Sequence, residues 1–159
     1  MLPPVLQHMQ SLGYAVFTGD YNLNLFGIRA TSRSADSYDD FIGCAYQVGG
    51  LWQVEYWPAT TDPGAYYLST ASEGFKVDGT AILVPGQYRG AYEVGPHGST
   101  RYMALVQSGA PVKVYRDGNR DLVLDTDCSS EIEAGWFGIN LHASSMQPYD
   151  EVKDKSNYS

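Results

Sequence analysis

The chain has 159 residues, with 18 acidic residues against 10 Lys and Arg, and its formal net charge is -8 at pH 7. This acidic balance argues against binding a nucleic acid backbone, and no stretch approaches the roughly 20 apolar residues that cross a bilayer. Because 43% of the residues are hydrophobic and the chain contains 17 glycines and 13 tyrosines, we expect one β-rich domain spanning residues 1–159.

Residues 1–13 are predicted to form one short helix, since apolar side chains recur at helical spacing behind Pro3 and Gly13 provides a stop. Strand-like segments then fill residues 14–143, separated by turn sequences rather than by linkers. The predicted strands are 14–17, 23–30, 41–48, 51–57, 80–84, 88–94, 102–107, 112–116 and 135–143.

The predicted strand 51–57 carries aromatic or apolar side chains on both of its alternating faces. Such a strand suits the interior of a β-sandwich or a barrel better than an edge. Residues 144–159 are polar and show neither strand nor helix periodicity, so we expect an exposed loop. The sequence therefore predicts a mostly β, sandwich-like or barrel-like fold with one N-terminal helix.

The two cysteines lie far apart in the sequence and could form one disulfide or remain two ordinary thiols. Cys44 stands in an apolar run and is predicted to be in the core, whereas Cys128 stands in a polar segment and is predicted to be exposed. Neither has a His or a second Cys at metal-ligand spacing, which argues against zinc.

Histidine is the usual proton carrier near neutral pH, so each of the three histidines is a candidate. His8 lies in the predicted helix among glutamines and is expected at the surface. His97 lies on a predicted turn, from which its ring could project into a cleft, and His142 ends a strand just before the polar loop. Catalytic side chains often occupy such strand ends, although a strand-end histidine can equally be a solvated residue.

Asp117, Asn119 and Asp121 place oxygen-bearing side chains at alternate positions, as in the first half of a calcium-binding loop. However, no glycine follows Asp121, and Cys128 occupies the twelfth position, where such a loop has glutamate. An Asp/Asn/Gly turn between two strands is therefore favoured over a calcium site, and no other cofactor is indicated.

Aromatic residues are numerous, and those that alternate within strands are expected in the core. Tyr66 and Tyr67 instead follow the turn sequence DPGA. They are the best candidates for an exposed platform that binds a substrate by stacking against sugar rings.

The segment GWFGINLHA at 135–143, with the polar stretch that follows it, resembles a family of phage proteins. In that family an aromatic-Gly-Ile-Asn-Ile-His segment precedes a Ser-x-Gly-Cys segment, which is similar to the signature of L,D-transpeptidase-type enzymes. Further segments resemble the same family in order along nearly the whole chain: GDYNLNLFGIRA, TTDPGAYYL, GTAILVPGQYRGAYEVG, YMALVQ and VYRDGNRDLVLD.

The resemblance implies an L,D-transpeptidase-type architecture and a Cys-His centre that acts on peptidoglycan. His142 would be the base or ion-pair partner of the cysteine, with Asn140 and the Gly138 backbone beside it, and His97 is a further candidate catalytic residue. Ser159 stands where the Ser of Ser-x-Gly-Cys is expected, and neither cysteine present occupies the position of the nucleophile. We therefore expect this chain to lack a C-terminal portion and its catalytic centre to be incomplete.

The resemblance thus implies a bacteriophage cell-wall protein, either endolysin-like or virion-associated, whose complete form is a peptidoglycan hydrolase or an L,D-transpeptidase-like enzyme. The alternative is a non-catalytic component of the phage virion, such as a tail protein, or a wall- or carbohydrate-binding module. Either would act at the cell wall, from the virion or inside the bacterial host. The expected partners are peptidoglycan or another wall polymer and other virion proteins.

Overall fold

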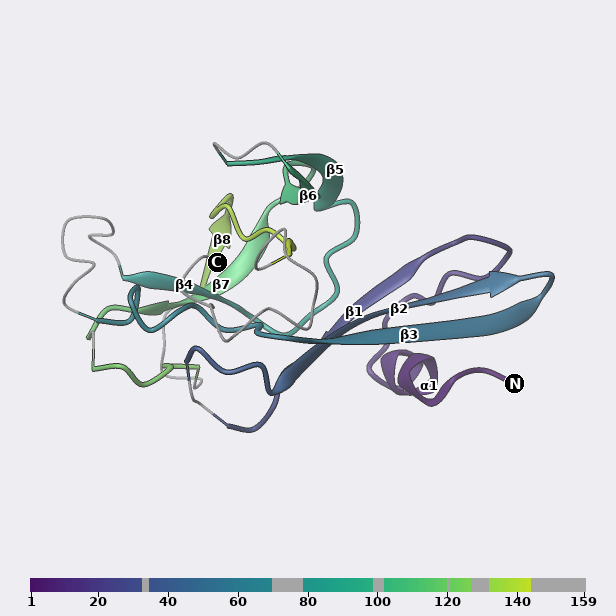
Figure 1. The fold of residues 1–159 in the computed structure, drawn as a ribbon, viewed down its shortest axis with the longest axis horizontal. Coiled ribbons are helices and arrows are strands. Elements are labelled where there is room, and N and C mark those ends of the chain that lie inside the picture. The colour runs from purple at the N-terminus through teal and green to yellow at the C-terminus, as the bar shows by residue number, and fades with distance from the viewer. Residues whose placement is uncertain (33–34, 70–78, 99–101, 120, 127–131, 144–159) are drawn as a thin grey trace. The chain divides into compact units, whose positions relative to one another are not determined.

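The computed structural model describes residues 1–32, 35–69, 79–98, 102–119, 121–126 and 132–143. Contacts between residues divide the chain into two compact units. The first unit contains residues 1–31 and 38–61, and the second contains residues 32–37 and 62–159. Both are built mainly from antiparallel strands (Figure 1).

The first unit is a three-stranded antiparallel sheet with one helix, α1 (Pro4–Ser11). Its strands are β1 (Asn24–Ile28), β2 (Asp40–Val48) and β3 (Leu51–Ala59), with β2 in the centre. The helix begins behind a proline, as the sequence predicts, and buries Leu6 completely.

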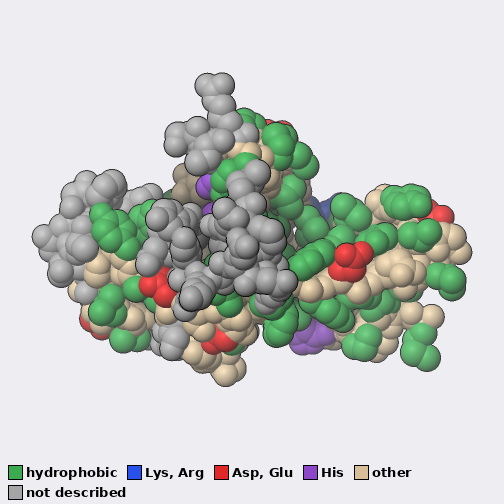
Figure 2. Space-filling model, viewed as in Figure 1, with side chains coloured by type: hydrophobic (Ala, Val, Ile, Leu, Met, Phe, Trp, Pro, Cys, Tyr) green, Lys and Arg blue, Asp and Glu red, His purple; other side chains and the backbone are tan. Residues whose placement is uncertain are grey.

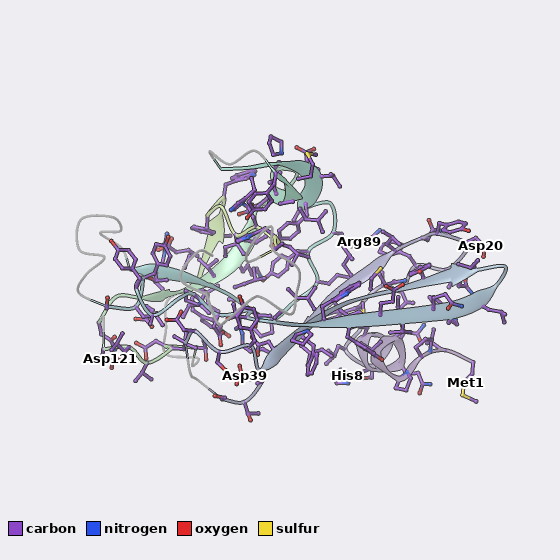
Figure 3. All side chains as sticks on the ribbon, in the orientation of Figure 1. Met1, His8, Asp20, Asp39, Arg89 and Asp121 are labelled. Carbon is purple, nitrogen blue, oxygen red and sulfur yellow. The ribbon has the colours of Figure 1, made fainter. Side chains whose placement is uncertain are left out.

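A tight turn joins β2 to β3, and an acidic side chain holds it. The carboxylate of Asp20 accepts hydrogen bonds from the backbone N–H groups of Gly49 and Gly50, both at 2.9 Å (Figure 3). Both glycines adopt positive φ, which glycine tolerates without strain. The turn thereby fixes the β2–β3 register, in which Val48 faces Leu51.

The prediction that 51–57 is an inner strand is wrong, because β3 pairs with β2 alone among the described strands. Its large side chains remain open to solvent: Leu51 is 70% exposed, Tyr56 54% and Trp57 50%. Figure 2 shows apolar side chains spread over the surface of this unit. Alternating aromatic residues therefore do not distinguish a strand buried on both faces from an edge strand with exposed rings.

The second unit contains two antiparallel sheets. The first has the order β4 (Thr80–Leu83), β7 (Val112–Asp117) and β8 (Ile132–Gly135). The second is the hairpin of β5 (Tyr92–His97) and β6 (Tyr102–Gln107).

The buried side chains of the second unit form two clusters. One contains Leu68, Ile82 and Leu124. The other contains Ala91, Val112 and Val114, and partly buried hydrophobic residues pack against it, among them Tyr88, Tyr92, Phe137 and Ile139. This second cluster ties the hairpin and the segment after β8 to the three-stranded sheet.

The mostly β character and the single short helix are confirmed, but the described strands form no closed barrel, since each of the three sheets ends in open edges. Three predicted strands differ from the structure by more than two residues. The strand predicted at 88–94 is β5, which begins only at Tyr92 and runs to His97, so the prediction that His97 lies on a turn is wrong. Residues 14–17 are irregular, because the side chain of Asn24 bonds both the N–H and the carbonyl of Phe17. The only regular strand near 135–143 is β8, which ends at Gly135.

In the described part of the chain, no helix has both the length and the apolar character needed to cross a membrane. Although the contacts divide the chain into two compact units, the expectation of one domain stays a prediction. The predicted loop at 144–159 lies outside the described residues.

Candidate functional site

The site is built on the end of the β5–β6 hairpin. The hairpin register places His97, the last residue of β5, directly opposite Tyr102, the first residue of β6. Directly opposed residues in an antiparallel pair present their side chains on the same face. The rings of His97 and Tyr102 accordingly lie 5.3 Å apart between centroids.

The segment after β8 runs alongside β6 and supplies the rest of the site. Leu105 and Leu141 exchange two backbone hydrogen bonds of 2.9 Å, which fixes the segment beside the hairpin. Phe137 and Ile139 pack against the second buried cluster, which anchors the segment from the apolar side. Gly138, between them, has a φ of +69°, which interrupts regular strand geometry.

Where this segment leaves β8, hydrogen bonds from side chains replace the backbone hydrogen bonds between neighbouring strands. The side-chain amide of Gln107 donates to the carbonyl of Gly135 at 2.8 Å and accepts from the N–H of Phe137 at 2.9 Å. In return, the backbone N–H of Gln107 donates to Oδ1 of Asn140 at 2.9 Å. Gln107 therefore fixes the path of the segment on both sides of Gly138.

Four side chains meet in what we call the histidine cluster: His97, Tyr102, Asn140 and His142. The imidazole rings of His97 and His142 are stacked, with centroids 4.1 Å apart and an interplanar angle of 20°. The hydroxyl of Tyr102 lies 2.9 Å from Nδ1 of His142, and Nδ2 of Asn140 lies 3.2 Å from Nδ1 of His97.

Partial burial changes the acidity of two members of the cluster. Loss of solvation, and secondarily the neighbouring His142, lower the pKa of His97 below its ordinary value of 6.5. Loss of solvation also raises the pKa of the Tyr102 hydroxyl, which therefore stays protonated as a hydrogen-bond donor. His97 is therefore neutral at neutral pH.

The structure brings together three of the four residues that the sequence singles out as catalytic: His97, Asn140 and His142. The fourth, Gly138, contributes a backbone conformation two residues before Asn140. The sequence reasoning did not identify Tyr102 or Gln107. Extending the predicted strand 88–94 to His97 and pairing it with the predicted strand 102–107 would have placed Tyr102 opposite His97, but nothing in the sequence marks Gln107.

The two tyrosines predicted to form a sugar platform pack edge-to-face on each other, with ring centroids 5.3 Å apart and an angle of 83°. Tyr66 is 40% exposed, and Tyr67 is half-buried. Their role in binding a substrate stays a prediction.

The Asp117–Asp121 segment is closed by its own hydrogen bonds. The amide nitrogen of Asn119 donates to Asp121 at 3.2 Å and to Asp125 at 2.9 Å, and Asp117 is buried where β7 ends (Figure 3 labels Asp121). Among the described residues no group of three or more His, Cys, Asp or Glu is placed to hold a metal ion. The turn and the weaker alternative of a calcium site at Asp117, Asn119 and Asp121 both stay predictions.

Cys44 is a free, buried thiol on β2 of the first unit, as expected for a core residue. Burial, and then the charge of Glu55, raise the pKa of this thiol. Cys44 therefore lacks the thiolate character that a nucleophile needs. Cys128 lies outside the described residues.

Comparisons with models of known protein families, with curated protein sequences and with solved structures found no match. The resemblance to L,D-transpeptidase-type phage proteins therefore stays an expectation.

Proposed function

We propose that this chain belongs to a phage-type protein that acts on peptidoglycan, and that the histidine cluster is the proton-transfer half of a Cys-His centre. The observation that carries the proposal is the stacking of His97 on His142, with Asn140 and Tyr102 hydrogen-bonded to the two rings. Ordinary packing does not need four polar side chains ordered in this way at a strand end. Acid–base catalysis does need polar side chains that are held in fixed positions.

In such a centre the imidazole of His142 takes the proton from a cysteine thiol. The thiolate attacks the carbonyl carbon of a stem-peptide amide, and the imidazolium returns the proton to the leaving amine. Water or a second amine then cleaves the thioester, giving hydrolysis or exchange. The resemblance places that cysteine after the position of Ser159, and the buried Cys44 does not fit the role.

Product analysis tests the class of reaction. Purified peptidoglycan is incubated with the complete encoded protein, including any residues after Ser159, and the released muropeptides are separated and weighed. We expect stem peptides that have gained one water or exchanged one amine. Cleavage confined to the glycan, or unchanged peptidoglycan, would overturn the proposal.

A non-catalytic role in wall binding is the second candidate, favoured by exposed rings on the first unit. Phe41, 45% exposed, and Tyr56, 54% exposed, lie on the same face of the β2–β3 pair, as the register shows. Flat exposed rings can stack on sugar faces. In co-sedimentation with purified cell walls, Tyr56→Ser should weaken binding about threefold to tenfold. Gln53→Ser, on the opposite face, is the matched control, and equal binding by both variants would exclude this role.

A further inference from the structure

The side-chain amide of Asn140 has only one orientation that its neighbours permit. The backbone N–H of Gln107 points at one end of the amide from 2.9 Å, and an N–H can only donate. The oxygen of Asn140 must occupy that end. Its NH₂ group therefore faces Nδ1 of His97, at 3.2 Å.

This orientation decides which nitrogen of His97 carries the proton. An amide NH₂ group donates and does not accept, so Nδ1 of His97 must present a lone pair. Neutral His97 then carries its proton on Nε2. Protonating Nδ1 would set two donors against each other, which disfavours the charged ring, and the lowered pKa of His97 has the same direction. The titratable side chains packed against His97 in the described contacts are His142 and Tyr102.

His142 is held in the opposite tautomer. Its Nδ1 lies 2.9 Å from the carbonyl oxygen of Ala143, which can only accept. A proton on Nδ1 satisfies that carbonyl, whereas a lone pair there would repel it. The hydroxyl of Tyr102 lies 2.9 Å from the same nitrogen and 3.3 Å from the same carbonyl. Neutral His142 therefore presents its lone pair on Nε2.

We propose that the stacked histidines are held in fixed and different tautomers: neutral His142 presents the lone pair of Nε2 as a proton acceptor, while His97 stays neutral with its proton on Nε2. Asn140 is the positioning residue that imposes this state on His97. The source of the proton that His142 accepts, a cysteine thiol, rests on the proposed function. The assignment of the two tautomers does not, because it follows from the hydrogen bonds alone.

Nuclear magnetic resonance of the imidazole nitrogens tests the assignment. In the His8→Gln variant, two-bond ¹H–¹⁵N correlations report only His97 and His142, because the chain has 3 histidines. His97→Gln and His142→Gln assign the two signals. We expect the Nε2–H form for His97 and the Nδ1–H form for His142, with His97 titrating below the ordinary value of 6.5.

Asn140→Asp provides the sharper test, because a carboxylate accepts at both ends. It keeps the hydrogen bond from Gln107 but should switch His97 to the Nδ1–H form and raise its pKa by about 1 to 3. An effect limited to packing would not change the tautomer. The proposal is overturned if His97 in the otherwise unchanged chain shows the Nδ1–H form or an average of both forms. It is also overturned if the folded Asn140→Asp protein keeps the original signal. Inactivity on peptidoglycan with both tautomers as assigned would instead count against the proposed function.

Discussion

At the scale of single residues, two polar groups are held by hydrogen bonds that the chain closes internally. In the second unit, Asn140 links the backbone of Gln107 to the ring of His97. In the first unit, the buried carboxylate of Asp40 accepts hydrogen bonds from the N–H of Ala30 and from both the N–H and the hydroxyl of Thr61. Single substitutions in these two regions should therefore change the stability of the protein.

The stability of the protein should depend on pH through His97. Because its folded-state pKa lies below 6.5, the unfolded chain binds more protons than the folded chain between the two values. The contribution to stability is full above the ordinary pKa and is lost as the pH falls through it. Urea denaturation across this pH range should show a steeper loss of stability for the unmodified chain than for His97→Gln. Equal slopes for the two proteins would contradict the lowered pKa.

Asp40→Asn should destabilise the first unit by about 1–3 kcal/mol, because an amide NH₂ group would face backbone or hydroxyl donors. Urea denaturation followed by tryptophan fluorescence measures the free energy of unfolding. Asp39→Asn is the matched control, since Asp39 is the exposed neighbour (Figure 3). A loss of stability as large in Asp39→Asn would show that the effect is not specific to the buried carboxylate.

At the scale of elements, periodicity predicts most strands because each one buries part of its surface. Residues 102–107 form β6 as predicted, and 41–48 and 112–116 differ from β2 and β7 by one residue. The segment after β8 could not be predicted as irregular, because Gln107, far away in sequence, supplies its hydrogen bonds. When a distant side chain replaces the hydrogen bonds between two strands, nothing in the local sequence indicates it.

Packing of an aromatic ring on a glycine holds the centre of the β1–β3 sheet. The ring of Phe26 covers Gly43 and meets Tyr56 edge-on, with centroids 5.9 Å apart. A Cβ at position 43 would strike this ring and would lie 2.6 Å from the backbone oxygen of Glu55.

Gly43→Ala should therefore lower the free energy of unfolding by about 1–3 kcal/mol through overpacking. The control is Gly27→Ala on the neighbouring strand, where the added Cβ would meet only Thr61 Cγ2, at an ordinary 3.7 Å. Denaturation curves of the two variants give the comparison. If both variants lose the same stability, the close packing at Gly43 is not the cause.

At the scale of the whole molecule, composition predicts the β-rich character but not the division into two units. The resemblance indicates His142 and Asn140, the end of a predicted strand also indicates His142, and a predicted turn indicates His97. The contact between them depends on pairing β5 with β6 and on seating the last segment beside β6. Such long-range pairing follows from the packing of the whole unit, which one sequence does not reveal.

In the proposed function, His142 transfers the proton in a reaction on peptidoglycan. The most direct measurement is the initial rate at which the complete encoded protein releases or exchanges stem peptides in purified peptidoglycan. It should be made for the unmodified protein, for His142→Ala and for His8→Ala, the last on the exposed face of α1 (Figure 3). We predict a loss of about 100-fold or more for His142→Ala and no loss for His8→Ala. An undiminished rate in His142→Ala would contradict the account.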